Sequence, residues 1–167
     1  VVLAATETNG PSIIEVVDGK VSVLRSSGAS EPDLHSIAFA TPLTWPTSDD
    51  QVAHGFFYHP DNVVESEEGA SELPPLIVNV HGGPTSAADP PYNLGVQYWT
   101  SRGFAYLDVN YRGSSGFSTS YRKAIYGHWG EVDVADVISG AKYLVERGLV
   151  DPARIAVRGA SAGGFTA

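Results

Sequence analysis

The chain contains no cysteine and no methionine among its 167 residues. The lack of cysteine excludes a disulfide framework and a thiolate metal site, and no spacing of His, Asp and Glu residues indicates a metal centre. We therefore expect no metal and no other cofactor. Because the chain starts at Val1 and lacks Met, we expect it to be an excised segment or an incomplete record of a longer protein.

Positive charge and long apolar runs are also scarce. Lys and Arg number 10 against 19 Asp and Glu, which gives a net charge of -9. This acidic balance argues against nucleic acid and an anionic membrane surface as partners. No apolar run approaches the ~20 residues that span a bilayer, and no signal peptide is visible. We expect a cytoplasmic protein. Its hydrophobic residues, 43% of the chain, suffice for the core of one domain.

The first 35 residues have the pattern of antiparallel β structure. Residues 12–17 and 20–24 are rich in branched apolar side chains and flank Asp18-Gly19, a strong signal for a tight hairpin turn. Residues 1–5 are expected to add a further strand. Residues 26–32 carry the Ser, Gly and Pro of a connection.

From about residue 40 onward, strands and helices alternate. Strands are predicted at residues 52–58, 76–80, 104–109 and 155–157, and helices at 93–102 and 131–147. The acidic residues 65–72 are expected to form a solvated hairpin tip. In the second helix one apolar stripe is formed by Val134, Ile138, Ala141 and Val145. The alternation predicts parallel strands with right-handed crossovers, and hence an α/β fold.

A serine between glycines follows the last predicted strand, in Gly159-Ala160-Ser161-Ala162-Gly163-Gly164. Taken alone, the pattern also fits a flexible Gly/Ser loop. Its place between a buried strand and a helix start favours a nucleophile elbow, in which Ser161 occupies a strained corner and Gly159 and Gly163 leave room for the backbone. The sequence therefore points to acyl-transfer chemistry.

A second glycine turn, His81-Gly82-Gly83-Pro84, follows the predicted strand at residues 76–80. It could be an ordinary strand exit. In α/β-hydrolases, however, an HGG-type turn at this point offers a backbone N–H to the developing oxyanion, and the residue after the nucleophile offers a second. The two donors would here be the N–H groups of Gly83 and Ala162.

Five stretches together resemble the catalytic domain of the prolyl oligopeptidase family of serine peptidases, above all its acylaminoacyl-peptidase and dipeptidyl-aminopeptidase branches. They are residues 42–49 (PLTWPTSD) leading to 54–58 (HGFFY), 81–84 (HGGP), 110–117 (NYRGSSGF), 127–136 (GHWGEVDVAD) and 159–164 (GASAGG). They occur in the order that the family shows. Each is weak alone, but the combination is specific.

The resemblance implies an α/β-hydrolase fold preceded by a β-propeller. Residues 1–35 would be the last strands of the propeller, and residues 36–167 the N-terminal part of the peptidase domain, ending at the elbow. Ser161 would be the nucleophile and would form an acyl-enzyme, with Gly83 and Ala162 as oxyanion donors. The triad Asp and His follow the serine in this family, so we expect residues 1–167 to be inactive alone.

The same resemblance implies short peptides as substrates and an aminopeptidase or oligopeptidase activity. The expected partners are these peptides, the rest of the catalytic domain and propeller, and further copies of the chain in a homo-oligomer. Other branches of the family carry Tyr where this chain has His81, so a side-chain oxyanion donor is not expected from this position.

Several other polar residues have structural interpretations. An upstream histidine could in principle activate Ser161, but His35, His54, His59, His81 and His128 are expected at surface or satisfied polar positions. Arg112 lies in a glycine-rich loop that lacks the phosphate-loop pattern, and we expect it to pair with Asp133 or Asp136. Trp129 is expected to pack rather than to recognise substrate.

Two other functions remain open from the sequence. An esterase or lipase could use the same elbow and oxyanion turn, but it would not need the antiparallel residues 1–35. Alternatively, residues 1–167 could be a non-catalytic half-domain. Alone it would expose a sheet edge and an apolar face, and we expect it to aggregate.

Overall fold

The computed structural model describes residues 1–28, 37–47, 49–60 and 72–167. Its N-terminal part is an antiparallel sheet in the order β1-β2-β3, formed by β1 (Val2–Ala4), β2 (Ser12–Val17) and β3 (Lys20–Ser26). Asp18 and Gly19 both have positive φ, 50° and 76°, as a two-residue hairpin turn requires. The predicted hairpin and the preceding strand are therefore confirmed.

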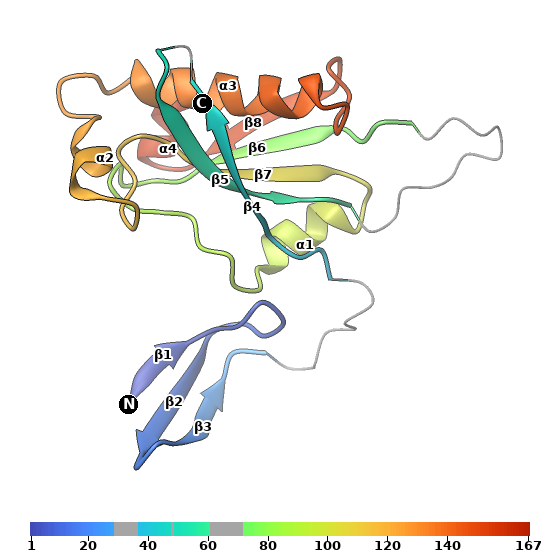
Figure 1. The fold of residues 1–167 in the computed structure, drawn as a ribbon. Helices are drawn as coiled ribbons and strands as arrows, with labels where there is room; N and C mark the ends of the chain where they lie inside the picture. Colours follow the sequence, from blue (N-terminus) through green and yellow to red (C-terminus); the bar gives the residue numbers. More distant parts are fainter. Residues whose placement is uncertain (29–36, 48, 61–71) are drawn as a thin grey trace.

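A five-stranded mixed sheet forms the rest of the described structure (Figure 1). Its strands are β4 (Thr41–Pro46), β5 (Val52–Tyr58), β6 (Leu76–Val80), β7 (Ala105–Asn110) and β8 (Ile155–Gly159), in the order β4-β5-β7-β6-β8. β6 is parallel to both β7 and β8, whereas β5 is antiparallel to β4 and β7. The predicted α/β class and its parallel strands are thus confirmed.

Strand β4 was not predicted, because Pro42 and Pro46 interrupt its pattern. Proline cannot donate to a strand ladder, so a proline-containing segment is a poor candidate for a strand. In the described structure β4 pairs only with β5 and forms the edge of the sheet, where a missing N–H is tolerated.

Helices cover both faces of this sheet. They are α1 (Leu94–Thr100), α2 (Thr119–Lys123), α3 (Val132–Glu146) and α4 (Ala162–Thr166). Figure 1 shows α1 and α3 on opposite faces. On the α3 face, Trp45, Val78 and Leu107 belong to one buried apolar cluster. On the α1 face, Tyr58 and Val96 belong to another. In the described residues, no helix is both long and apolar enough to cross a membrane.

The apolar stripe predicted for α3 was only partly right, because Ala141 and Val145 pack against the buried cluster but Ile138 does not. Ile138 is 48% exposed, whereas the buried side of the helix consists of Asp133, Asp136, Val137, Gly140 and Leu144. Two of these residues, Asp133 and Asp136, are carboxylates, and each accepts hydrogen bonds. Gly140 lies directly under Trp45, since a Cβ on it would approach the indole to 2.8 Å. Carboxylates and glycine give no apolar signal, so periodicity missed these buried positions and included the exposed Ile138.

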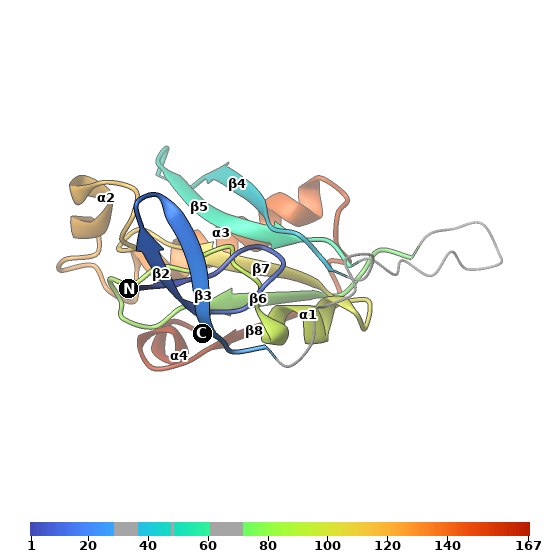
Figure 2. The same ribbon diagram turned by 90° about the horizontal axis from the view of Figure 1, so that it is seen from below.

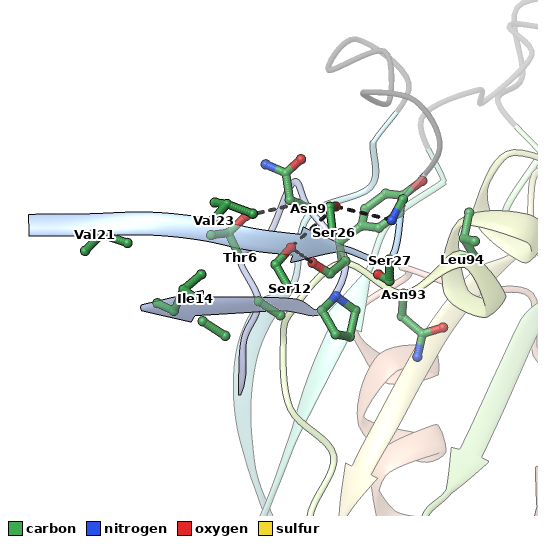
Figure 3. A pocket seen from close by; sticks show the side chains of 16 residues that line it. Thr6, Asn9, Ser12, Ile14, Val21, Val23, Ser26, Ser27, Asn93 and Leu94 are labelled. Carbon is green, nitrogen blue, oxygen red and sulfur yellow. Dashed lines mark hydrogen bonds between the residues drawn. The ribbon is translucent and has the colours of Figure 1, made fainter. Parts of the chain in front are cut away.

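The N-terminal sheet lies on the α1 side of the large sheet (Figures 1 and 2). The N–H of Tyr92 donates to the carbonyl of Thr6 at 2.7 Å and joins the two parts. An open cavity of about 910 Å³ lies beside this contact (Figure 3). It is lined by residues of the N-terminal sheet and its loops and by Asn93 and Leu94. The predicted boundary at residues 35 and 36, His35 and the acidic residues 65–71 lie outside the described residues.

Candidate active site

The three parallel strands β6, β7 and β8 have their carboxyl ends at the same end of the sheet. The chain leaves β6 toward α1 on one face, and it leaves β7 and β8 toward α3 and α4 on the other. Helix α4 contacts α3, because the Thr166 hydroxyl donates to Asp133 Oδ2 at 2.5 Å. The direction of winding therefore reverses at β6. In open α/β sheets, ligands bind at such a switch point.

Ser161 occupies the corner between β8 and α4. Its φ and ψ are 55° and -124°, and it is exposed. A positive φ is strained for a residue with a Cβ, at a cost on the order of 1–3 kcal/mol. Backbone hydrogen bonds from Gly163 to Ala160 and from Gly164 to Ser161, both 3.0 Å, hold the turn. The chain thus presents the serine at a sharp strand-to-helix corner.

Close backbone packing explains the two glycines around this serine. A Cβ on Gly159 would overlap the carbonyl of Gly163. A Cβ on Gly163 would overlap the carbonyl of Val80 and would lie 2.7 Å from that of His81. A side chain at Gly159 would therefore separate α4 from β8, and one at Gly163 would separate α4 from the end of β6.

The turn after β6 lies directly against the serine corner. A Cβ on Gly82 would lie 3.1 Å from the Ala160 carbonyl and 3.4 Å from Ser161 Cβ. The next residue, Gly83, is exposed and has a φ of 131°. Ala162, the first residue of α4, has an N–H with no intrahelical acceptor. Among the described residues, neither the Gly83 nor the Ala162 N–H donates a hydrogen bond.

The His81 side chain makes contacts through both ring nitrogens and through one face of the ring. Its Nδ1 lies 2.7 Å from the Gly82 carbonyl and its Nε2 lies 2.7 Å from Ser114 Oγ. The imidazole stacks on Tyr111 with ring centroids 4.4 Å apart. Burial lowers the pKa of His81, and the hydrogen bond to the Gly82 carbonyl partly opposes that shift. His81 is therefore built into the turn.

The segment after β7 holds the loop that follows β6. The Tyr111 hydroxyl lies 3.1 Å from the His81 carbonyl and 3.0 Å from that of Pro84. The Asn110 amide pairs with both the N–H and the carbonyl of Ala88. From the sequence, neither Tyr111 nor Asn110 was given a role in the site, because hydrogen bonds between distant loops leave no periodic signal.

Arg112 forms a buried ion pair with Asp136, one of its two predicted partners. Its Nη2 lies 2.8 Å from Asp136 Oδ1, and its backbone N–H donates to Asp136 Oδ2 at 2.7 Å. Its Nη1 contacts Asp49, an unpredicted partner, at 2.6 Å. Burial alone would lower the pKa of Arg112, but the two carboxylates outweigh it and raise that pKa. The other predicted partner, Asp133, instead accepts the Gly130 N–H at 2.7 Å.

The remaining histidines lie elsewhere in the described structure. His54 on β5 stacks on Phe117 with ring centroids 4.4 Å apart. His59 contacts the Pro60 carbonyl, and His128 forms a surface pair with Glu131. Among the described residues, none of these three side chains hydrogen-bonds to Ser161. In the same part of the chain, no three His, Asp or Glu side chains are grouped as metal ligands would be.

Trp129 packs against Phe165 of α4, with ring centroids 5.1 Å apart. Its side chain is 49% exposed, and that of Phe165 is 67% exposed. The pair lies one helical turn beyond Ser161, on the α3 side of the sheet.

Comparisons with known proteins agree on one family. Residues 90–167 match the prolyl oligopeptidase family. A puromycin-hydrolyzing peptidase of Mycobacterium tuberculosis superposes on 98% of this chain with a TM-score of 0.92 and 37% sequence identity. This chain is similar to peptidases over nearly its whole length, and its residues 90–167 carry the match to the prolyl oligopeptidase family.

Two curated relatives illustrate the range of similarity. Acylamino-acid-releasing enzyme 1 of Oryza sativa subsp. japonica is 38% identical over 91 residues, which are 54% of this chain and 12% of that enzyme. Dipeptidyl aminopeptidase BIII of Pseudoxanthomonas mexicana is 27% identical over 171 residues, 98% of this chain and 24% of that enzyme. The chain also spans 25% of the M. tuberculosis peptidase, so it corresponds to at most about a quarter of each relative.

Proposed function

We propose that this chain carries the nucleophile of a serine peptidase. Ser161 Oγ attacks the carbonyl carbon of a peptide bond while a base takes its proton. The amine leaves with a proton, an acyl-enzyme forms on Ser161, and water then releases the acid. The observation that carries the proposal is the strained, exposed position of Ser161 between β8 and α4.

The backbone N–H groups of Gly83 and Ala162 are proposed as the oxyanion donors. Neither has an acceptor among the described residues, and the contact of Gly82 with Ser161 Cβ brings their two turns together. Peptide dipoles that are already oriented stabilise the tetrahedral intermediate without reorganisation.

The base and its carboxylate partner are proposed to come from outside this chain. His81 is engaged at both ring nitrogens, and His54 and His128 have other contacts. The chain covers only 12–24% of the two curated relatives described above. We propose accordingly that residues 1–35 end a β-propeller, that residues 36–167 begin the peptidase domain, and that residues 1–167 alone do not turn over substrate.

Short peptides with a free or acylated N-terminus are the proposed substrates. The curated relatives are an acylamino-acid-releasing enzyme and a dipeptidyl aminopeptidase, and the similar solved structure is a puromycin-hydrolyzing peptidase. These names favour amide hydrolysis near a chain terminus over the esterase alternative, which uses the same backbone geometry.

The nucleophile is tested by intact-mass spectrometry after treatment of the full-length protein with a fluorophosphonate probe. We expect one adduct in the wild type and in the control Ser101→Ala, which alters an exposed serine at the end of α1. We expect none in Ser161→Ala. An adduct that persists in Ser161→Ala would assign the reactive group to another residue.

The substrate class is tested by comparing aminoacyl and N-acyl-peptidyl anilides, puromycin and a p-nitrophenyl ester. A peptidase gives Ser161-dependent turnover of at least one of the amides. Turnover of the ester alone would favour the esterase alternative.

A further inference from the structure

Ser114 lies behind the proposed oxyanion turn and has no assigned role. It follows β7, is fully buried, and stands at the centre of a short polar network. Its Oγ lies 2.7 Å from His81 Nε2 and 2.7 Å from the Tyr111 carbonyl. The neighbouring Ser115 N–H donates to the Ser86 carbonyl at 2.9 Å. This segment therefore contacts the loop that follows β6 at two points, His81 and Ser86.

The hydrogen-bonding partners define where the imidazole proton lies. The Gly82 carbonyl can only accept, so His81 Nδ1 must carry a proton to bond to it. In a neutral ring Nε2 is then an acceptor. Ser114 must give its single hydroxyl proton either to Nε2 or to the Tyr111 carbonyl, and that carbonyl already accepts the Ser114 N–H at 2.9 Å, so we assign the hydroxyl proton to Nε2. Burial lowers the pKa of His81 and so favours the neutral ring. The Ser114 hydroxyl thus selects the Nδ1-protonated tautomer.

This tautomer orients a peptide plane. The Gly82 carbonyl and the Gly83 N–H belong to the same planar peptide unit and point in opposite directions when it is trans. A hydrogen bond that fixes the carbonyl therefore also fixes the direction of the N–H. Because glycine at both positions leaves the local backbone free to rotate, the His81 side chain supplies a restraint that these two residues lack.

We propose that Ser114 is a positioning residue that directs the Gly83 N–H toward the oxyanion, acting through His81. The proposal rests on the proposed function of Ser161 and names a group that orients one of its two donors. Ser114 does not touch substrate. It holds His81, His81 holds the Gly82 carbonyl, and the peptide unit turns the Gly83 N–H toward the reacting carbonyl.

The kinetic test is Ser114→Ala in the full-length enzyme, with Ser115→Ala as the matched control. The Ser115 side chain makes no hydrogen bond among the described residues, and only its backbone N–H holds the loop. Loss of an oxyanion donor costs about 10²–10³ in kcat, so misdirecting one donor should lower kcat about 10-fold or more and change KM by less than about twofold. Wild-type kcat in Ser114→Ala would overturn the proposal.

A double-mutant cycle separates positioning from general packing. If Ser114 acts through His81, Ser114→Ala should cause no further fall in kcat in a His81→Ala background. Equal effects of Ser114→Ala with and without His81 would show that Ser114 acts by another route, and would overturn the proposal.

Histidine ¹⁵N NMR tests the same contact without reference to activity. The His81 signals are assigned by their loss in His81→Gln. We expect the neutral, Nδ1-protonated ring in the wild type and a decreased share of this tautomer in Ser114→Ala. An unchanged tautomer would contradict the proposal even in an inactive protein. Absence of fluorophosphonate labelling in the wild type would instead contradict the proposed function, so the two failures are distinct.

Discussion

Arg112 illustrates how differently two carboxylates can contribute to one buried cation. Asp136 is fully buried, whereas the Asp49 side chain is 53% exposed. Removal of one partner of a buried pair leaves an uncompensated charge, at a cost of about 3–5 kcal/mol, but an exposed partner contributes about 1 kcal/mol or less. We therefore expect Asp136→Asn to lower the free energy of unfolding by several times as much as Asp49→Asn.

Urea denaturation of the two variants measures this difference. The substitutions are isosteric, so they compare charge rather than volume. Equal losses of stability in Asp136→Asn and Asp49→Asn would show that the burial of Asp136 does not set its contribution.

Asp108 on β7 is a buried carboxyl group that should give stability a pH dependence. Burial raises its pKa from the ordinary 3.8 to about 6, although the Asn79 amide donates to it at 2.6 Å and Arg158 lies nearby. Between about pH 4 and 6 the folded chain binds more protons at this site than the unfolded chain. The contribution of Asp108 to stability therefore falls as pH rises through this window.

The substitution Asp108→Asn removes this ionisation. We expect the variant to be more stable than the wild type at pH 7.5, because no charge is then buried, and close to it at pH 4.5, where the wild-type carboxyl group is protonated when folded. Thermal unfolding at the two pH values measures the effect. The same difference between variant and wild type at both pH values would exclude Asp108 as the source.

Residue types at turns were predictable, but their partners were only partly so. The places of Ser161, Gly159 and Gly163 follow from a strand, a tight turn and a helix start, all of which are local. Asp49 and Ser114 were missed because each meets its partner across a gap of more than thirty residues, Arg112 and His81 respectively. Local sequence patterns carry no information about contacts between residues so far apart in the chain.

At the scale of elements, the junction of β6, β8 and α4 depends on the absence of a side chain at Gly163. A Cβ there would overlap the Val80 carbonyl, whereas a Cβ on the neighbouring Gly164 would lie 3.4 Å from its nearest neighbour. We expect Gly163→Ala to destabilise the fold by more than about 2 kcal/mol and to abolish fluorophosphonate labelling, since overpacking costs about 1–3 kcal/mol even in apolar cores.

Gly164→Ala is the matched control. It adds the same methyl group one residue later in α4, where alanine has the higher helix propensity by about 1 kcal/mol. Stability and labelling should stay close to those of the wild type. A similar loss of stability in both variants would show that α4 tolerates an added methyl group at neither position. The close approach of Gly163 to Val80 would then not be the cause.

Elements were predictable where their apolar pattern was regular. β5 and β6 begin and end where periodicity and turn signals place them, at residues 52–58 and 76–80. β4 was missed because of its prolines, and α2 because it has only five residues. The buried face of α3 was only partly identified, because Asp133, Asp136 and Gly140 are buried for specific contacts rather than for hydrophobicity.

At the scale of the molecule, residues 1–167 expose apolar side chains along β8 and α4. Val157 is 45% exposed and Phe165 is 67% exposed, and β8 pairs only with β6 among the described strands. Unpaired edges and contiguous apolar patches promote association. We expect residues 1–167 alone to aggregate, as measured by sedimentation velocity.

A charge on this edge should reduce the association. We expect Val157→Lys to increase the monomer fraction, whereas Ile138→Lys on the outer face of α3, 48% exposed, should change it less. A monomeric wild type with a cooperative thermal transition would contradict the prediction.

The placement of β6 between two later strands also has a consequence in time. Leu76 pairs with Ile155, roughly 80 residues further along the chain, and only this pairing brings the Gly82 turn to Ser161. Parallel pairing over such a separation is slow, because the loop entropy is lost before the contacts form. During synthesis the glycine turn leaves the ribosome before Ser161. We therefore expect the proposed nucleophile corner to be assembled late, after β4, β5, β6 and β7 have paired.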